Sequence, residues 1–269
     1  MKHINQFITE YIIKKKLNKP IDSEYKYHPQ TKEELIENIK ELLDKEETDF
    51  NCIDTSEITD MSNLFSDSYI DGNTERIIIK DMNINISNWN VSNVTNMGEM
   101  FNNCCSFDCD LSNWNVSKVE DMQYMFVYCK NFTGKGLENW NVSNVKYMAG
   151  MFTKCEIFTG KTLENWDVSK VTSMSEIFSD CSKFDCDLSK WNVSNVKDMF
   201  RMFDGCKKFE GKGLENWNVS NAVDMSFMFD GCLNLNCDLS KWNVKNVKYT
   251  NRMFANCNSL KKLPTWYKK

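Results

Sequence analysis

Apolar residues recur along this chain with a period of 25 or 26 residues, and tryptophan marks the period most clearly. Eight tryptophans follow one another at intervals of 25, 26, 26, 25, 26, 25 and 24 residues, and a cysteine comes fifteen residues after each of the first seven. Self-similarity at a fixed period of this length is the signature of a protein built from stacked repeats. The tryptophans are Trp89, Trp114, Trp140, Trp166, Trp191, Trp217, Trp242 and Trp266.

Within each repeat the apolar positions have a fixed phase, which we count from the tryptophan as position 0. Position −3 holds mainly Leu, +2 and +5 mainly Val, +8 and +11 mainly Met, +12 Phe, +15 Cys, and +18 Phe or Leu. One repeat of this size cannot bury all of these side chains by itself. Neighbouring repeats must therefore stack so that equivalent side chains form continuous buried columns.

The spacing inside one repeat predicts two short elements. The motif Leu-x-x-Trp-x-Val has the period of two that is typical of a strand, whereas Met-x-x-Met-Phe-x-x-Cys steps by three and four residues, as in a short α- or 3₁₀-helix. Position +7, just before the second motif, holds Asn96, Asp121 and Asp198, residues that favour a helix N-cap. One strand and one short helix per repeat predict an α/β solenoid of leucine-rich-repeat type with about eight coils.

The first part of the chain predicts two amphipathic helices. Residues 4–12 carry one apolar stripe, and a second helix begins at the capping box Thr31-x-x-Glu34 and carries a stripe between Leu35 and Leu43. Open ends of solenoids need a cover. We therefore expect a helical N-terminal cap over residues 1–50, a repeat solenoid over residues 51–260, and a C-terminal cap or tail over residues 261–269.

The first coil of this solenoid is expected to be degenerate. Ile53 occupies its tryptophan position, and Ile58, Met61, Leu64 and Phe65 follow in phase. The next tryptophan comes 36 residues after Ile53, which indicates an insertion of about ten residues between positions 67 and 77.

Charge and hydropathy exclude several partners. With 33 basic against 38 acidic residues, the net charge of −5 does not favour a nucleic-acid partner. No apolar run approaches the roughly 20 residues that a membrane helix needs. The N-terminal sequence has no secretory-signal pattern, which predicts a reducing, cytoplasmic setting by default and reduced cysteines. We expect a monomer with a protein partner of unknown identity.

The cysteines allow two interpretations. The seven at position +15 form either a buried column of small side chains or a metal or redox site, and no Cys-x-x-Cys pair or nearby histidine supports zinc. Cys109, Cys186 and Cys237 each follow a column cysteine by five residues and are either packed thiols or oxidisable partners. The near-constant Asn at +1 and Ser at +3 are similarly either backbone partners or a repetitive sugar- or ion-binding face.

Specific recognition is expected where the repeats differ. Positions +9, +10 and +14 vary from coil to coil and include large aromatic and Arg side chains of the kind that anchor protein interfaces. Ordinary surface variation is the alternative. The candidate protein-binding residues are Tyr124, Tyr128, Phe200, Arg201 and Phe227.

Catalytic chemistry finds no support in the sequence. Both histidines, His3 and His28, lie before the repeats, and there is neither a Gly-x-Ser-x-Gly motif nor a Gly-rich phosphate loop. We expect no enzyme activity, no catalytic or cofactor-binding residues, no metal site and no cofactor.

The repeat resembles that of the BspA-like leucine-rich-repeat surface proteins, a type of repeat also present in mycoplasma lipoproteins. The resemblance covers about residues 51–260 and is carried by segments such as LSNWNVSKVEDMQYMFVYC, residues 111–129. It implies a right-handed solenoid that serves adhesion or protein binding at a cell or virion surface, and it brings no catalytic residues. A cytosolic interaction or effector protein, and a structural spacer without a specific ligand, are the alternatives.

Overall fold

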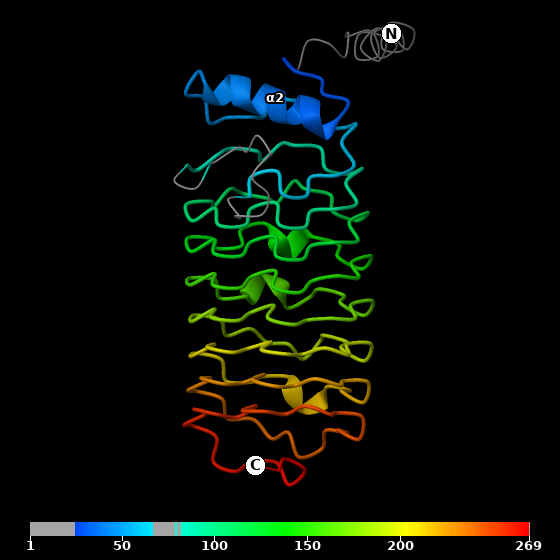
Figure 1. Cartoon of the computed structure of the whole chain (residues 1–269), viewed down its shortest axis with the longest axis vertical. Helices are drawn as coiled ribbons and strands as arrows, with labels where there is room; N and C mark the ends of the chain where they lie inside the picture. The colour runs from blue at the N-terminus through cyan, green and yellow to red at the C-terminus, as the bar shows by residue number, and fades with distance from the viewer. Residues whose placement is uncertain (1–24, 67–78, 80–81, 269) are drawn as a thin grey trace, which may run out of the picture.

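The computed structural model describes residues 25–66, 79 and 82–268 as a stack of coils, with the coils following one another in chain order along its long axis (Figure 1). An α-helix, α2 (Lys32–Leu43), lies at the N-terminal pole. Three 3₁₀ turns occur farther along the stack: η2 (Leu137–Asn139), η3 (Lys161–Leu163) and η4 (Leu214–Asn216).

Adjacent coils are joined by a parallel backbone ladder that follows positions +7 to +14. Isolated parallel bridges link the +7 residues of successive coils, from Asp60 through Asn96 and Asp121 to Tyr249. In the coils of Trp89, Trp114, Trp166, Trp191 and Trp217, the amides at +8, +10, +12 and +14 donate to carbonyls of the next coil. In the coil of Trp89 the donors are the amides of Met97, Glu99, Phe101 and Asn103, at 2.7–2.9 Å.

This ladder lies where the sequence predicted a helix. Instead of helical turns, the segment has two successive four-residue turns, with hydrogen bonds from +11 back to +8 and from +15 back to +12. The third residue of each turn, at +10 or +14, has a positive φ, the conformation that a type II turn requires. The side-chain oxygens at +7 cap these turns: Asp121, for example, accepts from the amide of Gln123 at 2.9 Å.

The predicted strand is also absent from the described coils. Around Trp114 the backbone makes tight turns, in which the Trp114 amide donates to Leu111 and the Val119 amide donates to Val116. In three coils the residues just before the tryptophan form η2, η3 or η4. The period of two at this motif therefore reflects a turning chain whose Trp and Val point inward.

Three of the buried columns in the core make regular contacts from coil to coil. The indole Nε1 of each tryptophan donates to a backbone carbonyl of the preceding coil, as Trp166 does to Leu137 at 2.9 Å. Each +15 thiol likewise donates to the carbonyl of the +12 Phe one coil earlier, as Cys181 does to Phe152. The rings at +12 stack from coil to coil with centroids 5.4–5.8 Å apart.

The alternation between 25 and 26 residues arises in the linker before the tryptophan motif. Longer linkers contain glycines, and η2, η3 and η4 occur in the three coils that have them. Gly136 has a φ of 94°, and a Cβ there would lie 2.2 Å from the backbone nitrogen of Ser112 in the preceding coil. Glycine is therefore required where this longer linker crosses a shorter one.

The N-terminal pole agrees with the predicted second helix and first coil. Thr31 caps α2 by accepting from the amide of Glu34, and the carboxylate of Glu34 accepts from the amide of Gln30. Leu35, Ile39 and Leu42 are buried. The bridge between Asp60 and Asn96 confirms the phase assigned from Ile53. The predicted helix over residues 4–12 and the predicted insertion over residues 67–77 lie outside the described residues.

The C-terminal tail closes the aromatic columns. Trp266 stacks on Trp242 with ring centroids 6.3 Å apart and donates from its indole to the carbonyl of Leu239. Tyr267 sets its ring edge-on to Phe254. The tail therefore covers the tryptophan side of the last coil.

Candidate protein-binding face

The edge of the stack formed by positions +9, +10 and +14 carries the variable residues, and we call it the turn face. Its side chains project from the two turns of each coil. Four of the five predicted binding residues occupy the positive-φ positions of these turns: φ is 55° at Tyr124, 59° at Tyr128, 51° at Arg201 and 59° at Phe227. Phe200 occupies position +9 and precedes Arg201.

Large side chains at these positions are costly for the fold. The left-handed conformation brings Cβ close to the following carbonyl oxygen, which costs roughly 1–2 kcal/mol for a residue other than glycine. Other coils place better suited residues at the same positions, namely Gly150, Gly205, Gly231, Asn103 and Asn256. Packing of the core does not explain why tyrosine, phenylalanine or arginine stands there.

The two tyrosines form one group because both lie on the coil of Trp114. Tyr124 is 41% exposed and Tyr128 is 38% exposed. The Tyr124 ring lies against the backbone of Gly150 in the next coil, because a Cβ at Gly150 would lie 2.2 Å from its ring. Lys154 donates from Nζ to the Tyr128 hydroxyl at 2.6 Å and lies 4.4 Å from the ring centroid.

The other three predicted residues form a second group with Arg252, which we call the Phe–Arg cluster. Phe200 and Phe227 meet edge to face with centroids 5.9 Å apart. The Arg201 guanidinium lies 5.3 Å from the Phe200 centroid and 4.9 Å from the Phe227 centroid. The Arg252 guanidinium, from the coil that follows that of Phe227, lies 5.7 Å from the Phe227 centroid. The Nε of Arg201 is buried without a hydrogen-bond partner among the described residues.

Carboxylates lie beneath this second cluster. Arg252 binds Asp230 at 2.8 Å, and Arg201 lies 3.4 Å from Asp204. Burial raises the pKa of Asp204 to about 6; Arg201 opposes this shift, Asp230 and Asp180 add to it, and Arg252 again opposes it. Each of the two arginines therefore contacts both a carboxylate and an aromatic ring.

The structure thus brings the five predicted residues to one face but not to one cluster. The coils of Trp140 and Trp166 separate the tyrosines from the Phe–Arg cluster. Sequence reasoning missed Lys154 and Arg252 as members, and it missed the exposed rings of Tyr147 and Tyr249 at position +7. Tyr147 and Tyr249 could have been found as bulky residues at a position otherwise held by Asn, Asp or Ser.

The near-constant ladders have structural roles. The Asn at +1 accepts from the +3 amide of its own coil, as Asn115 does from Ser117 at 3.2 Å. The bonds between coils come from +4, where Asn144 donates to the carbonyl of Ser117 at 2.7 Å. The twelve cysteines are free thiols. Burial raises the pKa of Cys181 and its column neighbours far above the usual thiol range, so they stay protonated.

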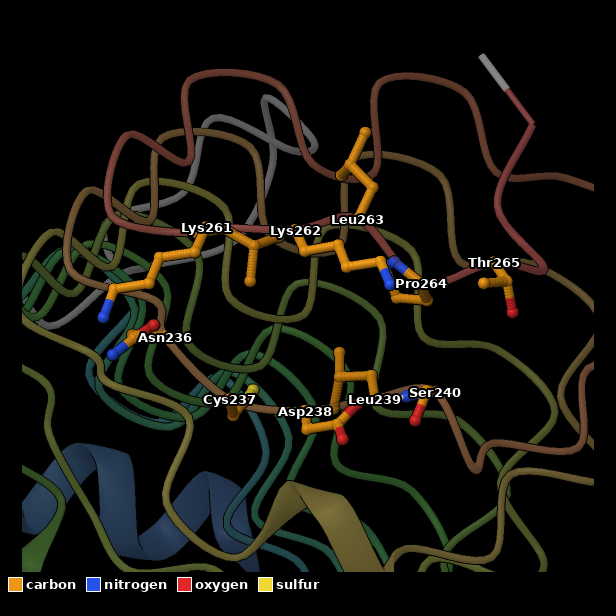
Figure 2. Close-up of a pocket in the computed structure, with 11 residues that line it drawn as sticks. Asn236, Cys237, Asp238, Leu239, Ser240, Lys261, Lys262, Leu263, Pro264 and Thr265 are labelled. Carbon is orange, nitrogen blue, oxygen red and sulfur yellow. Dashed lines mark hydrogen bonds between the residues drawn. The ribbon is translucent and has the colours of Figure 1, made fainter.

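A hollow of about 390 Å³ lies near the C-terminal pole, between residues 236–240 and the tail segment 260–265 (Figure 2). Its thiol, Cys237, is a weak nucleophile because burial raises its pKa to about 12. Lys261 and Lys262 lie on the tail side, and Asp238 lies on the opposite side. The arrangement offers cationic side chains and no activated nucleophile.

The described residues also lack two other kinds of feature. They contain no cluster of three or more His, Cys, Asp or Glu side chains arranged to hold a metal ion. Among them, no helix has the length and apolar character needed to cross a membrane.

Sequence comparison places the chain in a repeat family. A family described as "Mycoplasma protein of unknown function, DUF285" matches three overlapping segments, residues 32–162, 127–213 and 201–268. The chain belongs to this family. Its overlapping matches follow from the repeat, since one family unit fits the stack in several registers. No curated protein and no solved structure matches the chain.

Proposed function

We propose that this DUF285 protein is a non-catalytic scaffold that binds a protein through its turn face. The observation that carries the proposal is the set of large side chains at strained turn positions, of which Tyr124 and Tyr128 are exposed and Arg201 and Phe227 are partly exposed. These residues lower the stability of the turns and add little to the core. Binding energy at a protein interface is a reason for such residues to stand there.

The two clusters offer different chemistry to a partner. Tyr124 and Tyr128 present amphipathic rings that contribute apolar contact area with little loss of side-chain freedom. The Phe–Arg cluster is partly satisfied internally, because Arg201 and Arg252 already contact rings and carboxylates. We therefore assign the larger share of binding energy to the tyrosines.

The wider setting is part of the same proposal. The resemblance to BspA-like repeats favours a right-handed, leucine-rich-repeat-like solenoid that acts as an adhesin-like module at a cell or virion surface. A cytosolic interaction or effector protein remains the alternative, and a structural spacer is the third possibility. A thiol titration of native protein with and without reductant distinguishes an oxidising from a reducing setting.

The turn face is tested by affinity measurements on a partner found by cross-linking in the source cells. One variant replaces Tyr124 and Tyr128 by Gly, which suits the positive φ. A matched variant replaces Asn115 and Asn141, which occupy position +1 of the tryptophan motif, by Ser. We expect at least a tenfold loss of affinity for the tyrosine variant alone, with circular dichroism as the folding control. Loss only in the asparagine variant would move the site away from the turn face, and absence of any partner would favour the spacer.

A further inference from the structure

The coil of Trp242 carries a row of backbone donors that no described residue uses. In the coils of Trp89, Trp114, Trp166, Trp191 and Trp217 the amides at +8, +10, +12 and +14 donate to carbonyls of the next coil, as those of Met225, Phe227, Phe229 and Gly231 do. The equivalent amides of the last coil belong to Thr250, Arg252, Phe254 and Asn256. Within the described part of the chain they have no acceptor.

The opposite pole shows how the protein covers the other end of the same ladder. There the carbonyls of the first coil face the cap, and Lys32 from α2 donates to the carbonyl and the hydroxyl of Ser62. Lys32 also lies 3.6 Å from Asp60. One acceptor of this row, the Ser62 carbonyl, is thus covered by a cation. By the same electrostatic logic, the row of donors at the C-terminal pole fits acceptors that carry negative charge.

The charge of the last coil agrees with this polarity. From Trp242 to Lys269 the sequence has seven Lys or Arg residues and no Asp or Glu, although the whole chain carries −5. Lys248, Lys261 and Lys262 are exposed and make no ion pair with described residues. The C-terminal pole is therefore a positive surface on an otherwise acidic protein.

A hollow beside the donor row leaves room for an apolar side chain. It measures about 610 Å³ and lies between the ladder segment that contains Arg252 and Phe254 and the tail residues Leu260, Leu263 and Tyr267. The tail covers the rings of Trp242 and Phe254 through Trp266 and Tyr267, whereas Arg252 and Asn256 of the ladder segment stay exposed.

We propose that the C-terminal pole binds an extended acidic peptide segment of a partner protein, which adds one rung to the ladder. An extended segment presents carbonyls on one side at every second residue, and the free amides also alternate along the chain. Acidic side chains of the peptide would lie near Lys248, Lys261 and Lys262, and an apolar one would enter the hollow. This surface adjoins the turn face at Arg252 and Asn256, but it uses their backbone amides, which the function proposed for the turn face does not involve.

The test uses the full chain and a fluorescent eight-residue peptide of alternating Glu and Val with blocked ends. We expect the peptide to bind and to slow hydrogen exchange at the amides of Thr250, Arg252, Phe254 and Asn256. Thr250→Pro, which removes one donor, should weaken binding at least tenfold, whereas Thr250→Ala should leave it unchanged. If the proline variant does not fold, the exchange measurement on the unaltered protein decides.

Charge is tested separately. Replacing Lys261 and Lys262 by Gln should weaken binding severalfold and flatten its salt dependence, whereas replacing the exposed Lys161 and Lys183 by Gln should not. The double change Tyr124→Gly and Tyr128→Gly should leave peptide binding intact, so that failure of one site is distinguishable from failure of the other.

Three results would overturn the proposal. The first is unchanged exchange at the four amides in the presence of saturating peptide, or no binding of the peptide. The second is that a stapled helical peptide of the same charge, heparin or phosphatidylglycerol vesicles compete with the fluorescent peptide as well as the unlabelled extended peptide does. Such competition would mean that the surface recognises negative charge alone. The third is self-association in sedimentation that the Lys261 and Lys262 variant abolishes and the peptide does not compete for, which would make a second copy the occupant.

Discussion

The buried columns and the turn face are built from the same repeat under opposite constraints. In the columns, Trp, Phe and Cys recur because each side chain meets its own equivalent and also donates to, or stacks on, the neighbouring coil. On the turn face, positions +10 and +14 have a positive φ in the coils from Trp89 to Trp242 but hold Gly, Asn, Asp, Glu, Lys, Tyr, Phe or Arg. Packing fixes side-chain identity in the first region, whereas only backbone geometry is fixed in the second.

This difference indicates where information for a partner can be stored. A column residue cannot change without creating a cavity that also affects two neighbouring coils. A turn-face residue can change at the cost of a small backbone strain. The predictions below test how far the two regions differ, beginning with the largest effect.

Truncation of a column residue should have the largest effect. Trp166→Ala is expected to lower the free energy of unfolding by about 3–5 kcal/mol, because it opens a cavity between two complete coils and removes the hydrogen bond to Leu137. Denaturant titration measures the change, and Trp166→Phe should cost less. A loss below about 1 kcal/mol for the alanine variant would contradict the close packing of the column.

The columns could be predicted from the sequence because burial imposes a period on residue type. The tryptophan spacing gave the phase of every coil, Ile53 included, and the capping box located α2. The local conformation could not be read in the same way. Inward positions at +8, +11, +12 and +15 have helical spacing, yet here they arise from two successive turns.

The signal that distinguishes turns from a helix was weak in this chain. Gly150 at +10 and Gly205, Gly231, Asn103 and Asn256 at +14 fit a positive φ, but they are scattered among Tyr, Lys, Glu and Arg. The turn-face residues could be chosen by their variability, whereas their separation into two clusters depends on contacts between coils, such as that of Arg201 with Phe227.

Glycine at the linker crossing should show an intermediate effect. Gly136→Ala is expected to cost roughly 2–3 kcal/mol, since its Cβ would overlap the backbone of Ser112 and its φ is positive. Gly98→Ala is the matched control: its φ is not positive and its nearest contact would be 3.3 Å from a side-chain oxygen. Thermal or denaturant unfolding compares the two, and equal costs would show that the crossing is not a tight constraint.

The carboxyl beneath the Phe–Arg cluster should make stability depend on pH. The pKa of Asp204 is raised to about 6 in the folded protein, mainly by burial, against an ordinary value of 3.8. Its unfolded form therefore loses its proton first as pH rises, and folding stability falls between about pH 4 and pH 6. Asp204→Asn should remove this loss and be more stable than the unaltered protein by roughly 1–2 kcal/mol at pH 7.

Denaturant titrations of both proteins at pH 4 and pH 7 provide the measurement. The difference between them should shrink toward zero at pH 4, where Asp204 is largely protonated in the folded state. A difference that is the same at both pH values would indicate a packing effect of the amide rather than titration of this carboxyl.

A substitution at an exposed turn-face position should have the smallest effect on stability, and the sign of the change in unfolding free energy is informative. Tyr124→Gly removes the strain of a positive φ but also removes the ring that lies over Gly150, and it makes the unfolded chain more flexible. These contributions oppose one another, so we expect a change in unfolding free energy within about 1 kcal/mol of zero. Tyr124→Val, which places a β-branched residue at the same φ, should be less stable than the glycine variant.

Denaturant titration of the two variants gives their difference directly. If Tyr124→Gly instead costs as much as a column truncation, the ring is part of the core, and the argument that it stands there for a partner fails.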